Sequence, residues 1–257
     1  MSVLDSIIEG VREDLAMRRL PLAQIREALE SAPAVRNVGK AFAGPEISII
    51  AEVKRSSPSK GALAAIEDPG ALASRYEESG ANVISVLTER RRFGGSLDDL
   101  DAVRARVEIP ILRKDFMVDE YQFLEARAHG ADLVLLIVAA LSKNQLDDYY
   151  QLAKELGMSS LIEVHTHDEL ERALEISPEI IGVNSRNLKT LDVDSAAFAQ
   201  LIPRIPTSMV RVAESGISNR SDVEFAQEHG ATAILVGEAL VRSSDTELAM
   251  RELRGHR

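Results

Sequence analysis

A carboxylate and an ammonium stand two residues apart at the end of an apolar run in "IIAEVKRSSPSKG", residues 49–61. Residues two apart on a β-strand point to the same face, so the side chains of Glu52 and Lys54 should lie together. Such a pair is either a buried structural ion pair or part of an acid–base site, where burial and neighbouring charges shift pKa values. The two interpretations differ in whether further ionisable groups gather beside the pair.

Polar or ionisable residues also follow most of the other apolar runs of the chain. These residues are Glu89, Lys114, Glu163, Asn184, Arg186, Glu214 and Ser215. One charge at the end of a strand is usually solvated, whereas several charges in one partly desolvated pocket are typical of a catalytic site. If the fold brings these residues together, we therefore expect general acid–base chemistry from the lysines and glutamates.

The elements that would position these residues repeat along the chain. Eight short apolar runs alternate with amphipathic helical stretches, and they cover residues 47–53, 82–88, 109–114, 131–138, 159–164, 180–185, 209–215 and 232–237. The runs are nearly continuously apolar, which is typical of parallel strands buried on both faces. Three of them follow a Gly-Ala pair, in "SGAN", "HGAD" and "HGAT", where the glycine suits the end of a helix.

Eight strand–helix units in one chain of 257 residues predict an α/β fold, a single (β/α)8 TIM barrel over residues 47–257. An open doubly wound sheet is the alternative, but no G-x-G-x-x-G follows the first strand. Residues 1–46 are expected to form an N-terminal helical extension with an apolar stripe, and we expect one domain overall. The extension either covers one end of the barrel or forms a lid over the active site.

Two glycine-containing loops indicate a phosphate site. In α/β barrels the C-terminal ends of the strands converge on the active site, and the loops after the last two strands commonly bind phosphate. Gly216 and Gly237 lie in those loops and allow close approach of backbone N–H groups, and Ser57 after the first strand adds a hydroxyl. Glu238 would have to point away from a bound phosphate. Both glycines would also suit plain tight turns.

Composition narrows the possible partners. The net charge of -11 argues against nucleic acid and anionic membranes, although a local lysine and arginine cluster still admits an anionic substrate. The absence of cysteine excludes disulfides and thiolate metal sites and suits a cytoplasmic enzyme. We find no signal peptide and no apolar run long enough to span a membrane. His165 and His167 form an H-x-H pair, but the rest of a His-rich ligand set is missing, so we expect no metal site.

The same motifs resemble those of the indole-3-glycerol-phosphate synthase family of tryptophan biosynthesis. "IIAEVKRSSPSKG" is similar to the family's signature segment, and "LRKDF", "LIEVH", "IGVNSRNL", "VAESGI" and "ILVG" are similar to its later motifs, in the same order. The resemblance covers roughly residues 1–245. It implies a carbon–carbon lyase without metal or organic cofactor. Its substrate, 1-(2-carboxyphenylamino)-1-deoxyribulose 5-phosphate, would close its ring and lose CO₂ and water to give indole-3-glycerol phosphate.

The resemblance also implies roles for the site residues. Lys114 would be the principal general acid and Glu163 its acid–base counterpart in the dehydration. Lys54 would pair with the substrate carboxylate, and Glu52 would orient the two lysines. Which of Lys54, Lys114 and Glu163 performs each proton transfer stays open. Glu214 would position this network. The remaining residues would bind the substrate: Asn184 and Ser215 at the sugar hydroxyls, Ser57, Gly216 and Gly237 at the phosphate, Phe93 and Phe116 at the aromatic ring, and Leu235 and Arg186 elsewhere in the pocket.

Three other functions stay open. A phosphosugar isomerase of the same barrel group is one, although such enzymes often use a cysteine, which this chain lacks. A Schiff-base aldolase that uses Lys114 is the second. A non-catalytic barrel that binds a phosphorylated ligand is the third, and the full set of ionisable residues argues against it. In each case we expect a small anionic partner and a monomer or weak homo-oligomer.

Overall fold

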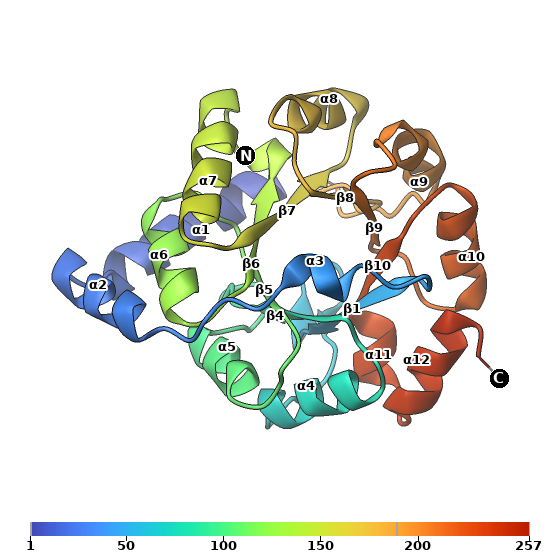
Figure 1. The fold of residues 1–257 in the computed structure, drawn as a ribbon, viewed down its shortest axis with the longest axis horizontal. Helices are drawn as coiled ribbons and strands as arrows, with labels where there is room; N and C mark the ends of the chain where they lie inside the picture. The colour runs from blue at the N-terminus through green and yellow to red at the C-terminus, as the bar shows by residue number, and fades with distance from the viewer. Residues whose placement is uncertain (1, 189, 257) are drawn as a thin grey trace.

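Eight parallel strands close into a barrel in the computed structural model, which describes residues 2–188 and 190–256 (Figure 1). The hydrogen-bonded order is β1-β10-β9-β8-β7-β6-β5-β4, and β4 pairs with β1 to close the barrel. The predicted (β/α)8 barrel is confirmed, and each barrel strand lies within its predicted range. The barrel strands are β1 Ser48–Val53, β4 Val83–Leu87, β5 Ile111–Lys114, β6 Leu133–Ile137, β7 Ser159–Val164, β8 Ile180–Asn184, β9 Val210–Glu214 and β10 Ala233–Val236.

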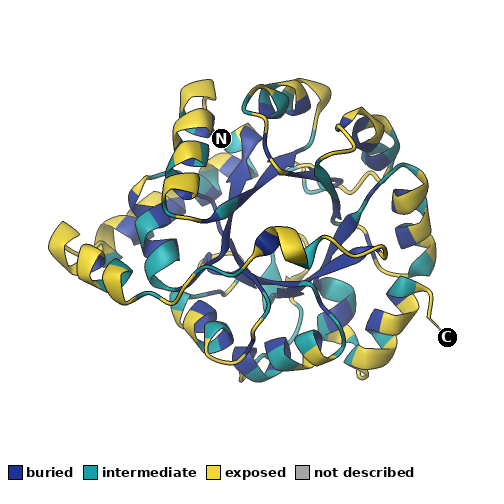
Figure 2. Ribbon diagram, in the orientation of Figure 1, coloured by how far each residue is buried: buried dark blue, intermediate teal, exposed yellow. Residues whose placement is uncertain are grey.

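Burial on both faces explains why the strands read as continuous apolar runs. Every residue of β1, β4, β6 and β8 is buried. Figure 2 shows this buried ring of strands, with exposed residues concentrated on the outer faces of the surrounding helices. Inward side chains fill the barrel and outward ones pack against the helices, so both sets are removed from water. This apolar burial, worth about 25 cal/mol per Å², drives closure of the barrel.

The helices that cover the barrel begin mostly at side-chain caps. Asp68 caps α4 (Pro69–Glu78) by accepting a hydrogen bond from the N–H of Ala71. Ser142 and Gln145 form a capping box at the start of α7 (Lys143–Glu155). The other outer helices are α5 Leu97–Arg104, α6 Tyr121–Ala128, α8 His167–Glu175, α9 Ala196–Leu201, α10 Arg220–Glu228, α11 Glu238–Arg242 and α12 Thr246–Arg254, with 3-10 turns at Val138–Ala140 and Ile202–Arg204.

The repeated Gly-Ala-polar motif joins helix ends to strand starts. Its glycines adopt left-handed φ angles of 92°, 78° and 100° at Gly80, Gly130 and Gly230, which glycine adopts at little cost. The polar residue of each motif accepts a hydrogen bond from a backbone N–H near the start of the neighbouring strand. The pairs are Asn82 with Ile49, Asp132 with Ile111, and Thr232 with Arg211. One repeated link therefore holds the end of the barrel where the strands begin.

The N-terminal extension is helical, as predicted, and comprises α1 Val3–Arg18, α2 Leu22–Ser31 and α3 Val38–Ala41. α1 packs Leu4, Ile7 and Val11 into the apolar core of the barrel. α3 crosses the end where the strands begin, in front in Figure 1, and the Ala41 carbonyl there accepts a hydrogen bond from Asn82. Within residues 2–188 and 190–256, no helix is both long and apolar enough to cross a membrane.

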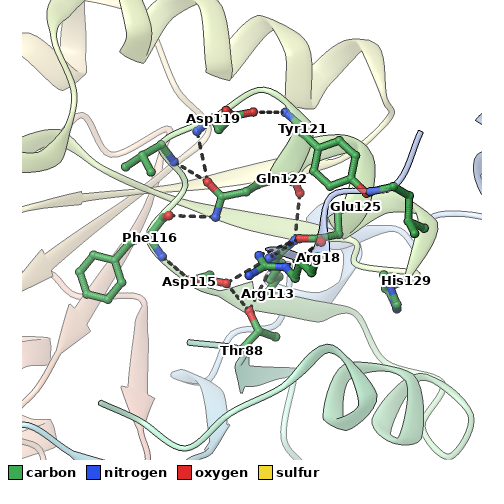
Figure 3. Close-up of polar contacts among 12 residues, drawn as sticks. Arg18, Thr88, Arg113, Asp115, Phe116, Asp119, Tyr121, Gln122, Glu125 and His129 are labelled. Atoms are coloured by element: carbon green, nitrogen blue, oxygen red, sulfur yellow. Dashed lines mark hydrogen bonds and ion pairs between the residues drawn. The ribbon is translucent and has the colours of Figure 1, made fainter. Parts of the chain in front are cut away.

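A buried charge network ties α1 to β5 and α6 (Figure 3). The fully buried guanidinium of Arg113, in β5, contacts Asp115 at 3.0 Å and Glu125 of α6 at 2.9 Å. Arg18 of α1 binds Glu125 through two N–H groups, at 2.9 and 3.0 Å. Burial raises the pKa of Glu125, but the charges of Arg113 and Arg18 bring it below its ordinary value. Because Asp115 also accepts from the N–H of Phe116 at 2.8 Å, the network fixes the loop that follows β5.

We predict that Arg113→Met lowers the free energy of unfolding by about 3–5 kcal/mol, because it leaves Asp115 and Glu125 buried with too little countercharge. Urea-induced unfolding measures the change. Arg19→Ala is the matched control, since Arg19 and its partner Asp119 are 46% and 38% exposed. Such an exposed pair contributes at most about 1 kcal/mol. Equal destabilisation by the two variants would contradict a stabilising role for the buried network.

Candidate active site

A cavity of about 600 Å³ opens at the C-terminal ends of the barrel strands. Every site residue named from the sequence as catalytic or substrate-binding lines this cavity. They are Glu52, Lys54, Ser57, Phe93, Lys114, Phe116, Glu163, Asn184, Arg186, Glu214, Ser215, Gly216, Leu235 and Gly237. Residues spread over most of the chain thus meet in one place, because parallel strands end at the same mouth.

Lys114 lies at the centre of the charged groups in the cavity. Its Nζ is 3.5 Å from Glu214 Oε2, 3.6 Å from Glu163 Oε2 and 3.9 Å from Glu52 Oε1. The other oxygen of Glu52 contacts Lys54 Nζ at 2.5 Å. The three glutamate side chains are 1–3% exposed, and Lys114 is 14% exposed. Three acids and two lysines therefore share a volume from which water is largely excluded.

The surroundings shift the pKa values of these groups in different directions. Burial lowers the pKa of Lys114, but the carboxylates around it, Glu163 first, raise it above its ordinary value. Burial raises the pKa of Glu52, and the charge of Lys54 brings it below its ordinary value. Burial also raises the pKa of Glu163, but the charge of Lys114 brings it below its ordinary value. Burial and the charge of Glu163 raise the pKa of Glu214 to about 8. Near neutral pH the site therefore holds both proton donors and an ionised acceptor.

Two glycines make room for the buried carboxylates. A Cβ on Gly182, in β8, would lie 1.9 Å from Glu214 Oε1, and a Cβ on Gly237 would lie 2.6 Å from Glu52 Oε2. Any other residue at these positions would occupy the space of the carboxylate. Gly182 was not predicted as a site residue, although a glycine inside a strand is a general sign that another group approaches closely.

The loops after β9 and β10 face the cavity with features that suit an anion. Ser215 and Gly216 adopt left-handed φ angles of 66° and 72°, which a serine adopts only under constraint. Glu238 pairs with Arg242 at 3.2 Å, so its charge is countered one helical turn away. Both residues line the cavity beside Gly237. Arg242, which was not predicted from the sequence, adds a cation to this side of the site.

The loop after β1 contains a short antiparallel hairpin that the sequence analysis did not predict. Its strands are β2 Ser56–Ser57 and β3 Gly61–Ala62. The hairpin brings Ser57, Ser59 and Lys60 to the cavity, with the two serine Oγ atoms 3.5 Å apart. Two hydroxyls and an ammonium thus lie on the side of the cavity where Ser57 was expected to meet a phosphate.

An apolar wall forms another side of the cavity. The rings of Phe93 and Phe116 have centroids 6.2 Å apart, and both line the cavity. α1 contributes Leu4 and Ile7, so the N-terminal helix is part of the wall of the site. An apolar wall beside convergent charges suits a ligand that carries both an aromatic ring and anionic groups.

Glu89, Arg91 and Arg92 attach elements to one another, and neither they nor Arg90 line the cavity. Glu89 accepts hydrogen bonds from the backbone N–H groups of Arg91, Phe93 and the residue between them. Arg91 pairs with Glu13 and Asp14 of α1, at 2.6 and 2.7 Å. These charges therefore fix the loop that carries Phe93 and bind it to α1.

The H-x-H pair divides between two environments. His165 is 10% exposed and lies between Glu163 and Glu169. His167 is 44% exposed and begins α8. Among the described residues, the His/Asp/Glu group with ligand atoms close enough for a metal ion is His167, Asp168 and Glu171, which lies outside the cavity.

Fold and cavity together define an α/β-barrel enzyme with an acid–base centre. A profile of the family "Indole-3-glycerol phosphate synthase" matches residues 4–253. The chain is 54% identical over 254 residues to indole-3-glycerol phosphate synthase of Mycolicibacterium gilvum, covering 98% of this chain and 93% of that protein. It is 55% identical over 255 residues to indole-3-glycerol phosphate synthase 1 of Streptomyces coelicolor, covering 98% and 95%. The chain belongs to the indole-3-glycerol phosphate synthase family, the carboxy-lyases of tryptophan biosynthesis, and the predicted family is confirmed.

More distant solved structures share the fold alone. Thiamine phosphate pyrophosphorylase from Pyrococcus furiosus is 16% identical with a TM-score of 0.61, covering 85% of this chain and 96% of that one. A 3-hexulose-6-phosphate synthase is 19% identical with a TM-score of 0.62, covering 81% and 99%. Family membership therefore rests on the sequence match, and it selects the lyase over the isomerase, aldolase and binding-protein alternatives.

We predict that the free energy of unfolding falls between pH 4.5 and about 8 more steeply in the wild type than in Glu214→Gln. The pKa of Glu214 rises from 4.5 to about 8 on folding, so in this window the folded state keeps a proton that the unfolded chain releases. Stability then falls with pH by up to about 1.4 kcal/mol per unit, and a glutamine cannot contribute to the slope. Urea unfolding at several pH values measures this slope. Glu155→Gln is the control, because Glu155 is exposed. Parallel curves for wild type and Glu214→Gln would contradict the shift.

Proposed function

We propose that this chain converts 1-(2-carboxyphenylamino)-1-deoxyribulose 5-phosphate into indole-3-glycerol phosphate, releasing CO₂ and water. The observation that carries the proposal is an ammonium, Lys114, held by three buried carboxylates at 3.5–3.9 Å in a barrel of this family. The cavity of about 600 Å³ also lies within the usual range for small-molecule sites.

Ring closure needs an acid, because the ketone oxygen gains a proton as the aromatic carbon attacks the ketone carbon. Lys114 suits this role, since its raised pKa keeps it protonated at neutral pH. Its low exposure also strengthens its field on the carbonyl group. A positioned acid of this kind contributes about 10²–10⁴-fold to the rate. Lys114 is therefore assigned as the principal general acid.

Dehydration follows the loss of CO₂ and needs an acid and a base together. Lys114, once it has regained a proton from water, gives it to the leaving hydroxyl while a C–H proton is removed, which completes the aromatic indole ring. Glu163 is the base, because its pKa is lowered and its Oε2 lies at the cavity, 3.6 Å from Lys114 Nζ. That short distance also lets the two groups exchange a proton between steps.

Lys54 and Glu52 prepare the other end of the reacting system. Lys54 is 19% exposed at the cavity and binds the substrate carboxylate that later leaves as CO₂. Glu52 contacts both lysines, at 2.5 and 3.9 Å, and so positions them relative to each other. Phe93 and Phe116 enclose the aromatic ring, which holds the attacking carbon near the ketone.

The sugar and phosphate groups occupy the opposite side of the cavity in this proposal. Asn184 and Ser215 contact the sugar hydroxyls. Glu214 positions Lys114, whose Nζ lies 3.5 Å away. The phosphate lies among the backbone N–H groups and hydroxyls of the loops after β1, β9 and β10. The residues assigned to it are Ser57, Gly216 and Gly237, and Arg186 and Leu235 complete the pocket.

The reaction proposed here uses side chains and backbone groups throughout, with neither a metal nor an organic cofactor. We place the protein in the cytoplasm as a monomer or weak homo-oligomer, with a phosphorylated small molecule and no nucleic acid as its partner. The net charge of -11 supports the exclusion of nucleic acid as a partner. The lack of cysteine supports the cytoplasm as the compartment. We also propose that extension and barrel form one domain, supported by the core that α1 shares with the barrel.

The experiment that tests the proposal follows indole fluorescence when purified protein meets the carboxyphenylamino substrate in the presence of EDTA. Wild type should form product, and Lys114→Ala should lose at least about 10²-fold in kcat, because the general acid is gone. Lys143→Ala is the control, since that lysine is 73% exposed on α7. A well-folded wild type that forms no product would refute the lyase assignment.

Gly182→Ala tests the geometry of the acid–base centre without changing any ionisable group. The new Cβ would displace the Glu214 carboxylate, so we predict a loss of about 100-fold in kcat, as for other displacements of about 1 Å in active sites. Gly44→Ala is the control, because no atom lies within 4 Å of its added Cβ. Equal rates in two folded variants would show that the space beside Glu214 is not required.

A further inference from the structure

His165 has a position that the mechanism above does not use. It follows β7 directly, and its imidazole Nε2 lies 3.4 Å from Glu163 Oε1. Its other nitrogen, Nδ1, lies 3.1 Å from Glu169 Oε2. Glu169 also accepts a hydrogen bond from the backbone N–H of His165 at 2.7 Å, so it holds this residue at two points. The imidazole thus lies between two carboxylates, one of which lines the cavity.

Local sequence explains why Glu169 points at His165. Thr166 caps α8 by accepting a hydrogen bond from the N–H of Glu169. In a complete capping box the Glu169 carboxylate would return to the N–H of Thr166, but here it accepts from His165 instead. The first turn of α8 therefore delivers a carboxylate to the imidazole.

Glu163 and Glu214 provide an internal comparison. Both are 1–2% exposed, and both lie within 3.6 Å of Lys114 Nζ. The pKa of Glu214 is nevertheless raised, whereas that of Glu163 is lowered, first by the charge of Lys114 and then by that of His165. Glu163 divides its oxygens, with Oε2 toward Lys114 and Oε1 toward His165. Among the described residues, neither oxygen of Glu214 has a hydrogen-bond partner, and His165 acts on Glu163 as a charge at 3.4 Å.

The charge on His165 persists when that on Lys114 does not. Burial lowers the pKa of His165, but the neighbouring carboxylates of Glu163 and Glu169 raise it to about 10. Once Lys114 has given its proton to the substrate, it no longer stabilises the Glu163 carboxylate. A buried carboxylate without a cation takes up a proton and stops acting as a base. The imidazolium supplies the second cation that Glu163 needs at that moment.

We propose that His165 is a positioning residue for the reaction, whose imidazolium, held by Glu169, keeps the Glu163 carboxylate oriented and charged beside Lys114. This inference rests on the proposed function. The other charged groups near this unit are Glu214 and Lys114 on the cavity side, and His167 and Arg204 on the outer side.

The outer side of His165 allows a chemical test. The imidazole also lines a separate surface pocket of about 570 Å³, together with exposed residues that include Thr166, Gln200 and Arg204. A small molecule can therefore reach the position of the ring from outside, without entering through the active-site cavity. Free imidazole should occupy the space that His165→Ala leaves.

The experiment compares kcat and KM across pH for wild type, His165→Gln and His165→Ala with and without imidazole. In His165→Gln we expect kcat to fall by about 10²-fold at neutral pH with KM unchanged, and the acidic limb of the kcat profile to move to higher pH. Imidazole should restore the activity and the acidic limb of His165→Ala. His167→Gln, two residues along and exposed, is the matched control and should behave as wild type.

The possible outcomes separate this inference from the function on which it rests. No product from wild type would refute the function itself. Product from wild type, together with an unmoved acidic limb in His165→Gln and no response of His165→Ala to imidazole, would overturn the role of His165 alone. If the His165 variants fail to fold, Glu169→Gln gives the same test, because it weakens the hold on the imidazolium. Its acidic limb should move the same way, and an unmoved limb there would overturn the inference.

Discussion

A desolvated ammonium, that of Lys114, is the charge on which the rest of the site depends. An unpaired ion in such a place costs several kcal/mol, so the lysine needs the carboxylates around it. Those carboxylates in turn need Lys114, because burial alone would protonate them. The groups therefore hold one another in their working states. Glu214, with the raised pKa, and Glu163, with the lowered one, show that differences in surroundings set the protonation of two neighbouring carboxyl groups in opposite directions.

Alternate residues of a barrel strand point to opposite sides, so one strand can serve the cavity and a structural network at the same time. β5 directs Lys114 into the cavity, while the adjacent Arg113 joins a buried network with Asp115 and Glu125. That network holds the loop after β5 and, through Arg18, the C-terminal end of α1. The other end of α1 contributes Leu4 and Ile7 to the cavity wall. Glycines in β8 and after β10 leave the volume that the carboxylates fill. Stability and function thus use neighbouring residues of the same strands.

The barrel and the membership of the cavity could be predicted from the sequence, because parallel strands have a clear apolar pattern and end at one mouth. Properties that depend on contacts between distant residues could not. Gly182 lies beside Glu214, and His165 contacts Glu169, only in the folded chain. Glu89 looked like another strand-end acid, but its carboxylate accepts from nearby backbone N–H groups. Protonation states likewise depend on three-dimensional distances that spacing does not contain.

The protonation of Lys114 can be observed by side-chain NMR of ¹⁵N-labelled lysine, with Lys114→Ala to assign the signal. Exposed lysines should lose their proton near the ordinary pKa of 10.5, while the Lys114 signal should remain that of an ammonium to higher pH. Such a result would show that the three carboxylates outweigh burial. A Lys114 signal that becomes a neutral amine below pH 10.5 would contradict the electrostatic basis proposed for this active site.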